Sequence, residues 1–226
     1  YLRYLMLIWR IPHRLERARF YMEKNEDEAV RILLSILSLQ KHNIDANWLL
    51  AQYNVRKKRF VMALMYLNDI LRAGKFTLTV TEQDVRETLA DLYIRTGNID
   101  KAIAQYNTLQ KKYLLSAGVY KRAIRLNLGA GGLTQARDLL ADALGHYPED
   151  GELHFMAAQT DYESGRFSSA KEKLRKAVDR GYASPEIDLL QGKIYFILSD
   201  FEKALHYFQR LPAHYVSDSE VEGIMG

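Results

Sequence analysis

Few residues in this chain have the types and spacing that catalysis or metal binding requires. The chain has no cysteine, which excludes disulfides, thiolate metal sites and a cysteine nucleophile. No two of its six histidines form the i, i+4 pair beside a glutamate that holds zinc on a helix; they are His13, His42, His146, His154, His206 and His214. Asp84, Glu87 and Asp91 have helical spacing, but no histidine accompanies them as an acid–base or metal partner. We therefore predict that the chain is not an enzyme and that it carries no metal and no cofactor.

Two further motifs resemble anion sites. Gly129-Ala130-Gly131-Gly132 is glycine-rich, but it follows an expected helix and lacks the Gly-Lys-Ser/Thr continuation of a phosphate-binding loop. Arg56-Lys57-Lys58-Arg59 is the densest positive run, and both a solvated turn and a phosphate or lipid site are open interpretations. We predict a turn between helices at both places.

The distribution of charge argues against nucleic acid as a partner. The formal net charge is +4, and residues 1–19 supply all of it, since residues 20–226 hold 27 basic and 27 acidic side chains. A nucleic-acid-binding protein normally spreads its basic excess over a face of the fold. We therefore expect a protein partner.

The elements that position these residues are visible as a repeat of 34 residues. Alanine recurs at this interval, and a large apolar residue follows each alanine by four positions; the pairs are Ala102 and Tyr106, Ala136 and Leu140, Ala170 and Leu174, Ala204 and Phe208. Small residues stand twelve positions before three of these alanines, at Ala90, Ala158 and Gly192, while Ile124 is the exception. Five positions before each alanine stands a glycine or, in the last copy, a serine; these residues are Gly97, Gly131, Gly165 and Ser199. An apolar residue follows two positions later, at Ile99, Leu133, Phe167 and Phe201.

These columns are typical of antiparallel helix pairs. Small residues let two helices approach closely, and the large residue one turn later fills the space beside the contact. Glycine accepts the left-handed conformation that ends a helix. Each pair leaves an apolar face that only the next pair can cover. The pattern thus predicts an all-α solenoid of helix–turn–helix repeats.

The period and the columns resemble the tetratricopeptide repeat family. The family has a pattern of small, aromatic, glycine, alanine and aromatic positions. One copy matches it with Ala90, Tyr93, Gly97, Ala102 and Tyr106, and the next three copies match it at the corresponding positions. An earlier copy contains Ala51, Phe60, Ala63 and Leu67, and five extra residues around Gly74–Glu82 separate it from the next. A weak first copy has Phe20, Ala29 and Leu33, but Arg17 at the small-residue position.

We therefore expect a single right-handed superhelical domain over residues 1–226, with about six repeats. They are predicted at 10–43, 44–82, 83–116, 117–150, 151–184 and 185–218. Residues 219–226 match the start of a further repeat, so we expect the parent protein to continue beyond residue 226.

Resemblance to the family implies where a partner binds. In the family, the first helices of successive repeats line a concave groove that holds a partner peptide or helix. The corresponding residues are Trp48, Gln52, Arg56, Asp84, Glu87, Asp91, Arg95, Lys121, Arg125, Phe155, Gln159, Tyr162, Lys193 and Phe196, with Glu163 and Leu189 beside them. This surface is expected to be acidic in the third repeat, basic in the fourth and aromatic toward the end.

The resemblance also implies a function. Some members clamp the carboxylate at the end of a chaperone, but Glu87, Asp91, Met156 and Glu186 do not fit that clamp. We predict a non-enzymatic scaffold or adaptor, which could be the soluble part of a membrane-anchored assembly factor. The alternative is a substrate-recruiting or regulatory segment of a larger enzyme or of a polysaccharide-export protein.

The first residues leave two interpretations open. Tyr1–Ile11 is apolar apart from two arginines and is too short to span a bilayer, which needs about 20 residues. It is either a cap helix on the first repeat, the favoured interpretation, or the end of a membrane helix with a basic cytoplasmic flank. The compartment stays open between the cytoplasm, the cytoplasmic face of a membrane and the periplasm.

Overall fold

The computed structural model describes residues 9–212 and Tyr215. Most of the segment that we expect to be a cap helix or the end of a membrane helix lies outside the described residues. The predicted start of a further repeat at 219–226 also lies outside them. Both expectations remain untested.

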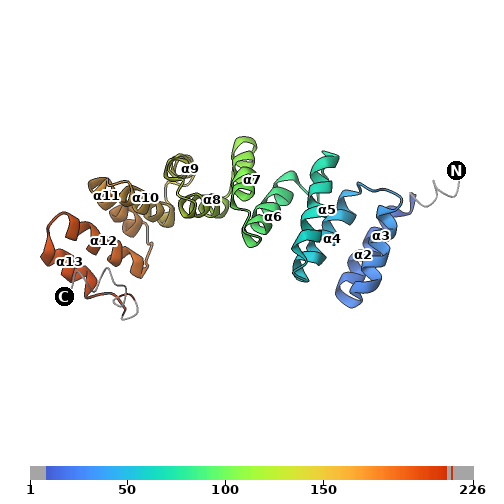
Figure 1. The fold of residues 1–226 in the computed structure, drawn as a ribbon, viewed down its shortest axis with the longest axis horizontal. Helices are drawn as coiled ribbons and strands as arrows, with labels where there is room; N and C mark the ends of the chain where they lie inside the picture. Colours follow the sequence, from blue (N-terminus) through green and yellow to red (C-terminus); the bar gives the residue numbers. More distant parts are fainter. Residues whose placement is uncertain (1–8, 213–214, 216–226) are drawn as a thin grey trace. The chain divides into compact units, whose positions relative to one another are not determined.

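The described residues form twelve α-helices and no strand, as the all-α prediction requires. The helices form six consecutive helix–turn–helix pairs, and Figure 1 shows each first helix beside its second. Their bounds are α2 Ile11–Lys24, α3 Glu26–Leu37, α4 Ile44–Arg56, α5 Phe60–Ala73, α6 Glu82–Arg95, α7 Ile99–Lys112, α8 Ala117–Gly129, α9 Leu133–His146, α10 Gly151–Glu163, α11 Phe167–Asp179, α12 Pro185–Ile197 and α13 Phe201–Phe208.

The chain divides into two compact units, which we describe separately. Unit 1 is Tyr1–Leu114 and contains α2 to α7; unit 2 is Leu115–Gly226 and contains α8 to α13. Each unit holds three helix pairs and has an apolar core between the helices of its pairs.

The 34-residue columns lie in these cores, as predicted. The recurring alanines and their large apolar partners are between 0% and 3% exposed. The contact is close in the last pair, where a Cβ atom added to Gly192 would lie 2.4 Å from Cε1 of Phe208. Complete burial of a side chain such as Phe208 contributes roughly 1.5–3 kcal/mol. Close approach at the small residue makes this burial possible.

The glycine column supplies the turns within the pairs. Gly97, Gly131 and Gly165 have φ between 73° and 76°, a region that glycine enters without steric cost. Ser199 and Lys58 adopt the same left-handed conformation, with φ of 61° and 56°. The turn therefore imposes one backbone geometry, and the chain accepts it even where the residue is not glycine.

The two helices of the first pair have a shorter connection than those of the second pair, which explains why the first repeat matches the 34-residue pattern weakly. Asn25 alone separates α2 from α3, whereas three residues separate α4 from α5. The repeat frame places the small residue of α2 at position 17, which is Arg17. The small residue that is fully buried in α2 is Ala18, one position later. Ala18 thus takes the role that Arg17 could not.

The two predicted turns at the charged and glycine-rich motifs are confirmed. Residues 57–59 connect α4 to α5, and residues 130–132 connect α8 to α9. In the first of these turns, Lys57 forms an ion pair of 2.6 Å with Glu26 in the preceding repeat.

The insertion after α5 is held to the body of unit 1 by hydrogen bonds. Gly74 ends α5 with φ of 63°, and Thr81 begins α6 with a capping box to Asp84. Between them, the Thr79 hydroxyl donates to Asp45 on α4 at 2.9 Å, and Arg19 from α2 donates to the same carboxylate at 2.9 Å.

Candidate partner-binding surface

A groove opens between the first helices of the last two repeats. It lies between α10 and α12 in unit 2 and encloses about 190 Å³. Its lining residues come from both helices: Gln159, Tyr162, Glu163, Glu186, Leu189, Leu190 and Lys193. Three of these, Gln159, Tyr162 and Lys193, are predicted site residues, and Glu163 and Leu189 are their expected neighbours.

The groove combines an apolar floor with charged rims. Leu190 is 7% exposed and belongs to the core, and the ring of Tyr162 packs against Phe167 with centroids 5.6 Å apart. Glu186 accepts a hydrogen bond of 3.0 Å from the Tyr215 hydroxyl. The lining also contains the positive charge of Lys193 and the negative charges of Glu163 and Glu186. Such a surface can bury an apolar side chain and select charged neighbours at the same time.

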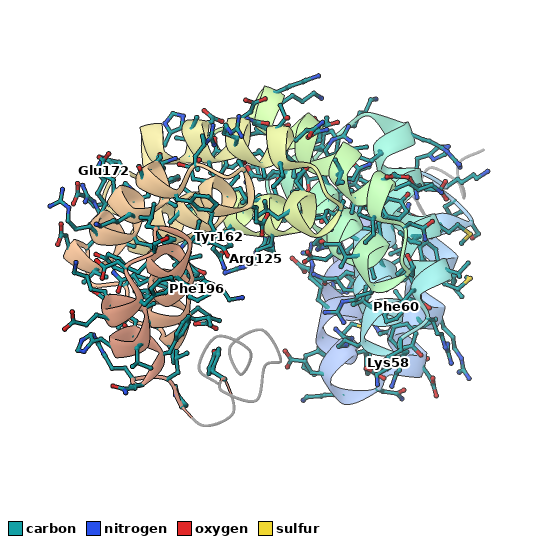
Figure 2. All side chains as sticks on the ribbon, turned by 60° about the vertical axis from the view of Figure 1, so that its left-hand side comes forward. Lys58, Phe60, Arg125, Tyr162, Glu172 and Phe196 are labelled. Carbon is teal, nitrogen blue, oxygen red and sulfur yellow. The ribbon has the colours of Figure 1, made fainter. Side chains whose placement is uncertain are left out.

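Figure 2 shows how the first helices of unit 2 present their side chains. Arg125 on α8, Tyr162 on α10 and Phe196 on α12 lie on one side of the unit, and Glu172 on the second helix α11 lies on the other. Phe196 extends the aromatic end of this surface and packs edge-on against Phe201 at 5.5 Å.

Phe155 has a different position from the one its register suggests. It is 5% exposed and packs against Tyr182, with ring centroids 5.1 Å apart. Tyr182 follows α11 and covers the ring, so Phe155 supports the groove from below. We leave Phe155 out of the proposed contact surface.

The basic part of the expected surface has acidic partners inside unit 2. The Lys121 ammonium lies 2.8 Å from Asp150 and 2.7 Å from Glu152, and Arg125 forms an ion pair with Glu152. Burial opposes the charged form of Lys121, but the two carboxylates outweigh it and raise its pKa. Both cations therefore join α8 to the beginning of α10, and their positive charge is already compensated.

In unit 1, the predicted residues of α4 remain at the surface. Trp48 is half-buried and packs on the core, and Gln52 is exposed. Arg56 is exposed and lies 3.6 Å from Glu26. These residues offer an aromatic side chain beside polar groups.

The predicted acidic residues of α6 take part in local contacts. Asp84 accepts from the backbone and hydroxyl of Thr81, and Glu87 accepts a hydrogen bond of 3.0 Å from Gln83. Asp91 accepts from the hydroxyl of Tyr106 at 3.4 Å. Arg95, one turn later, is exposed. In the part of the chain that the structure describes, no three His, Cys, Asp or Glu side chains are placed to hold a metal ion.

Two lining residues were neither predicted site residues nor their expected neighbours. Glu186 and Leu190 reach the groove from the start and the middle of α12. Glu186 lies three residues before Leu189 and seven before Lys193, so helical spacing placed it on the same face. The sequence did contain that signal.

Family models match the part of the chain where the columns are most regular. Two models described as tetratricopeptide repeat match residues 87–151 and 127–194. Residues 87–194 are thus similar to the tetratricopeptide repeat family. The matched part extends from α6 to α12. No curated protein sequence matches the chain significantly.

Several solved structures share this tetratricopeptide fold. PilF of Pseudomonas aeruginosa has 14% identity and a TM-score of 0.63, with 95% of this chain and 96% of that chain covered. PilW, described as a widely conserved type IV pilus biogenesis factor, has 16% identity, a TM-score of 0.59 and coverage of 96% and 98%. YrrB, described as having an unusual peptide-binding site, has 12% identity, a TM-score of 0.63 and coverage of 78% and 89%. Because these sequence identities are low, the comparisons show a shared fold and nothing more.

None of the described helices combines the length and the apolar character that crossing a membrane demands.

Proposed function

We propose that this chain is a tetratricopeptide repeat protein and acts as a non-enzymatic scaffold or adaptor that holds a peptide or helix of a partner protein. The α10–α12 groove of unit 2 is its main contact surface. The observation that carries the proposal is the groove itself, in which Tyr162 and Leu189 stand between charged residues from two successive first helices. The tetratricopeptide repeat family, whose models match residues 87–194, binds proteins through such surfaces.

The lining defines the chemistry of the partner. An aliphatic or aromatic side chain fits against Leu189 and the ring of Tyr162, where it would displace water from apolar surface. An acidic group of the partner would face Lys193, and a basic group would face Glu163. A short amphipathic segment satisfies all three requirements.

The similar structures support a role in assembly. The description of PilW as a pilus biogenesis factor and that of YrrB as a peptide-binding protein both fit a scaffold that brings other proteins together. We extend this to the chain as part of the proposal, including association of the parent protein with a membrane-bound assembly.

Site-specific photocrosslinking tests the proposal. A photoreactive phenylalanine derivative is placed at Tyr162, and a matched protein carries it at Asp138, an exposed position on the second helix α9 of unit 2. In cells that express the parent protein, we expect a discrete crosslinked partner from position 162 and none from position 138. Equal adducts from both positions, or none from position 162, would contradict the assignment of the groove.

A charge-reversal pair provides the second measurement. Lys193→Glu should reduce recovery of that partner at least fivefold, while Lys111→Glu, at an exposed position of unit 1, should leave recovery unchanged. Equal recovery with both variants would show that Lys193 does not contact the partner.

A further inference from the structure

Unit 2 has a second groove, away from the surface formed by its first helices. Two cavities of about 460 and 620 Å³ lie along one stripe of α11, which runs from Ser168 through Lys171 and Arg175 to Val178. The two cavities share Gln191 on α12 and Tyr207 on α13 as walls. The two cavities adjoin at these shared walls between α11 and the last helix pair, and together we call them the outer groove.

The length of the outer groove fits a short peptide. Ser168 and Val178 are ten residues apart on a helix that rises about 1.5 Å per residue, so the stripe is about 15 Å long. An extended chain covers about 3.3 Å per residue, and the groove therefore accommodates about four or five residues.

Two stacked tyrosines form a rigid wall of the outer groove. The rings of Tyr195 and Tyr207 are nearly parallel, at 7°, with centroids 5.6 Å apart. The ammonium group of Lys171 lies 4.7 Å from the centroid of the Tyr195 ring, and that of Lys203 lies 5.4 Å from it. A cation over an aromatic face is held in place by the ring quadrupole without losing its charge. Lys171 is thereby positioned at the groove.

The charges along the outer groove are only partly compensated. Of the two lining carboxylates, Glu172 is paired with Lys176 at 2.8 Å and Asp188 with Arg210 at 3.4 Å. Among the described residues, Lys171 has no carboxylate within 4 Å, although its charge acts on Asp200 from farther away. Arg175 pairs with the exposed Asp179 at 3.6 Å and also acts on Glu172 from beyond ion-pair distance. The groove thus offers two cations, one turn apart, beside apolar surface from Val178 and Tyr207.

We propose that the outer groove binds an extended acidic peptide segment of a partner protein, with aspartate or glutamate side chains at Lys171 and Arg175 and an aliphatic side chain against Tyr207. Carboxylates pair with both cations, and the guanidinium of Arg175 can hold one of them through two hydrogen bonds. The shared walls at Gln191 and Tyr207 give the peptide backbone and an apolar side chain their contacts. This site is separate from the α10–α12 groove, which is lined by other residues.

An array of short peptides of varied charge tests this proposal. The array is probed with the full chain, with the double variant Lys171→Gln/Arg175→Gln, and with the matched control Lys75→Gln/Lys111→Gln, which removes the same charge at exposed positions of unit 1. Circular dichroism verifies that all three proteins are equally helical.

The expected result separates a local site from general attraction. Peptides that combine acidic and aliphatic residues should bind the unchanged chain and the control, and their signal should fall at least fivefold for Lys171→Gln/Arg175→Gln. Equal loss in both variants would show general electrostatic attraction and would overturn the proposal. The absence of binding by acidic peptides, or binding that is the same in all three proteins, would overturn it as well. A loss confined to peptides without acidic residues would count against the charge pairing.

Discussion

Gly192 on α12 and Phe208 on α13 pack so closely that a single added carbon at Gly192 would lie 2.4 Å from the aromatic ring. Phe208 is fully buried, and it fills the contact between the helices of the last pair. Elsewhere alanine has the role of Gly192, as at Ala90 and Ala158, both also fully buried. The size of this one residue therefore determines how closely α12 and α13 can pack.

Gly192→Ala should destabilise unit 2 by about 1–3 kcal/mol, because the added methyl group forces the ring of Phe208 or the helices apart. Chemical denaturation followed by circular dichroism measures this loss. Gly145→Ala in α9 is the control, since nothing lies within 4 Å of a Cβ atom there, and alanine should stabilise that helix by about 0.5–1 kcal/mol. Equal stability of the two variants would show that the last pair repacks freely.

Ser199→Gly should stabilise the chain by about 0.5–1 kcal/mol, because Ser199 has φ of 61° in a turn where the three preceding repeats place glycine. Ser168→Gly, in the first turn of α11, should destabilise the chain because glycine is unfavourable within a helix. Denaturant midpoints of the two variants check the prediction. A loss of stability in Ser199→Gly would mean that the serine side chain makes a contact that offsets its backbone strain.

Glu82 should make part of the stability of unit 1 depend on pH. The hydrogen bond from Lys112 at 2.8 Å, together with those from Arg86 at 2.7 Å and Tyr113 at 2.9 Å, lowers the pKa of Glu82 to about 2, although burial acts in the other direction. Since the folded pKa lies below the unfolded value of 4.5, this stabilisation is fully present above about pH 4.5 and is lost as the pH falls toward 2.

The variant Glu82→Gln should therefore lose about 2 kcal/mol near neutral pH, and its difference from the unchanged chain should shrink as the pH falls from 4.5 to 2. The free energy of unfolding, measured at several pH values, checks this. Glu149→Gln serves as the control because Glu149 is 80% exposed, and it should change stability little at any pH. A difference between Glu82→Gln and the unchanged chain that does not vary with pH would contradict the assignment.

Lys121→Glu should destabilise unit 2 by about 2 kcal/mol, because it replaces two ion pairs with repulsion from Asp150 and Glu152 at a position that is only 18% exposed. Thermal unfolding at low and high salt measures the effect, which should diminish as salt screens the repulsion. Lys111→Glu, at an exposed position on α7, is the matched control. An unchanged unfolding temperature for Lys121→Glu would indicate that α8 and α10 are not joined by these charges.

The core columns could be predicted because close packing of two helices leaves little freedom in residue size. Ala102 and Tyr106 are both fully buried, as their recurrence every 34 residues required. The same frame failed in the first repeat, where the buried residue is Ala18, because the connection through Asn25 is shorter and moves the contact by one position. Spacing alone cannot reveal a change in the length of a turn.

The candidate site was only partly accessible from the sequence. The family resemblance placed Tyr162, Leu189 and Lys193 on one surface, and they do line one groove. It could not show that Tyr182 covers Phe155, or that Asp150 and Glu152 compensate the charge of Lys121, because these contacts join residues about thirty positions apart.

The sequence by itself determined the repeated helix pair, since residue size and glycine at fixed positions dictate how two neighbouring helices pack and turn. Only the tertiary structure decided which surface charges remain available and where grooves open, as between α10 and α12 or beside Tyr207. The physical reason is distance. Packing within a pair depends on residues close in sequence, whereas electrostatic compensation and the shape of a groove depend on side chains that the stacking of repeats brings together.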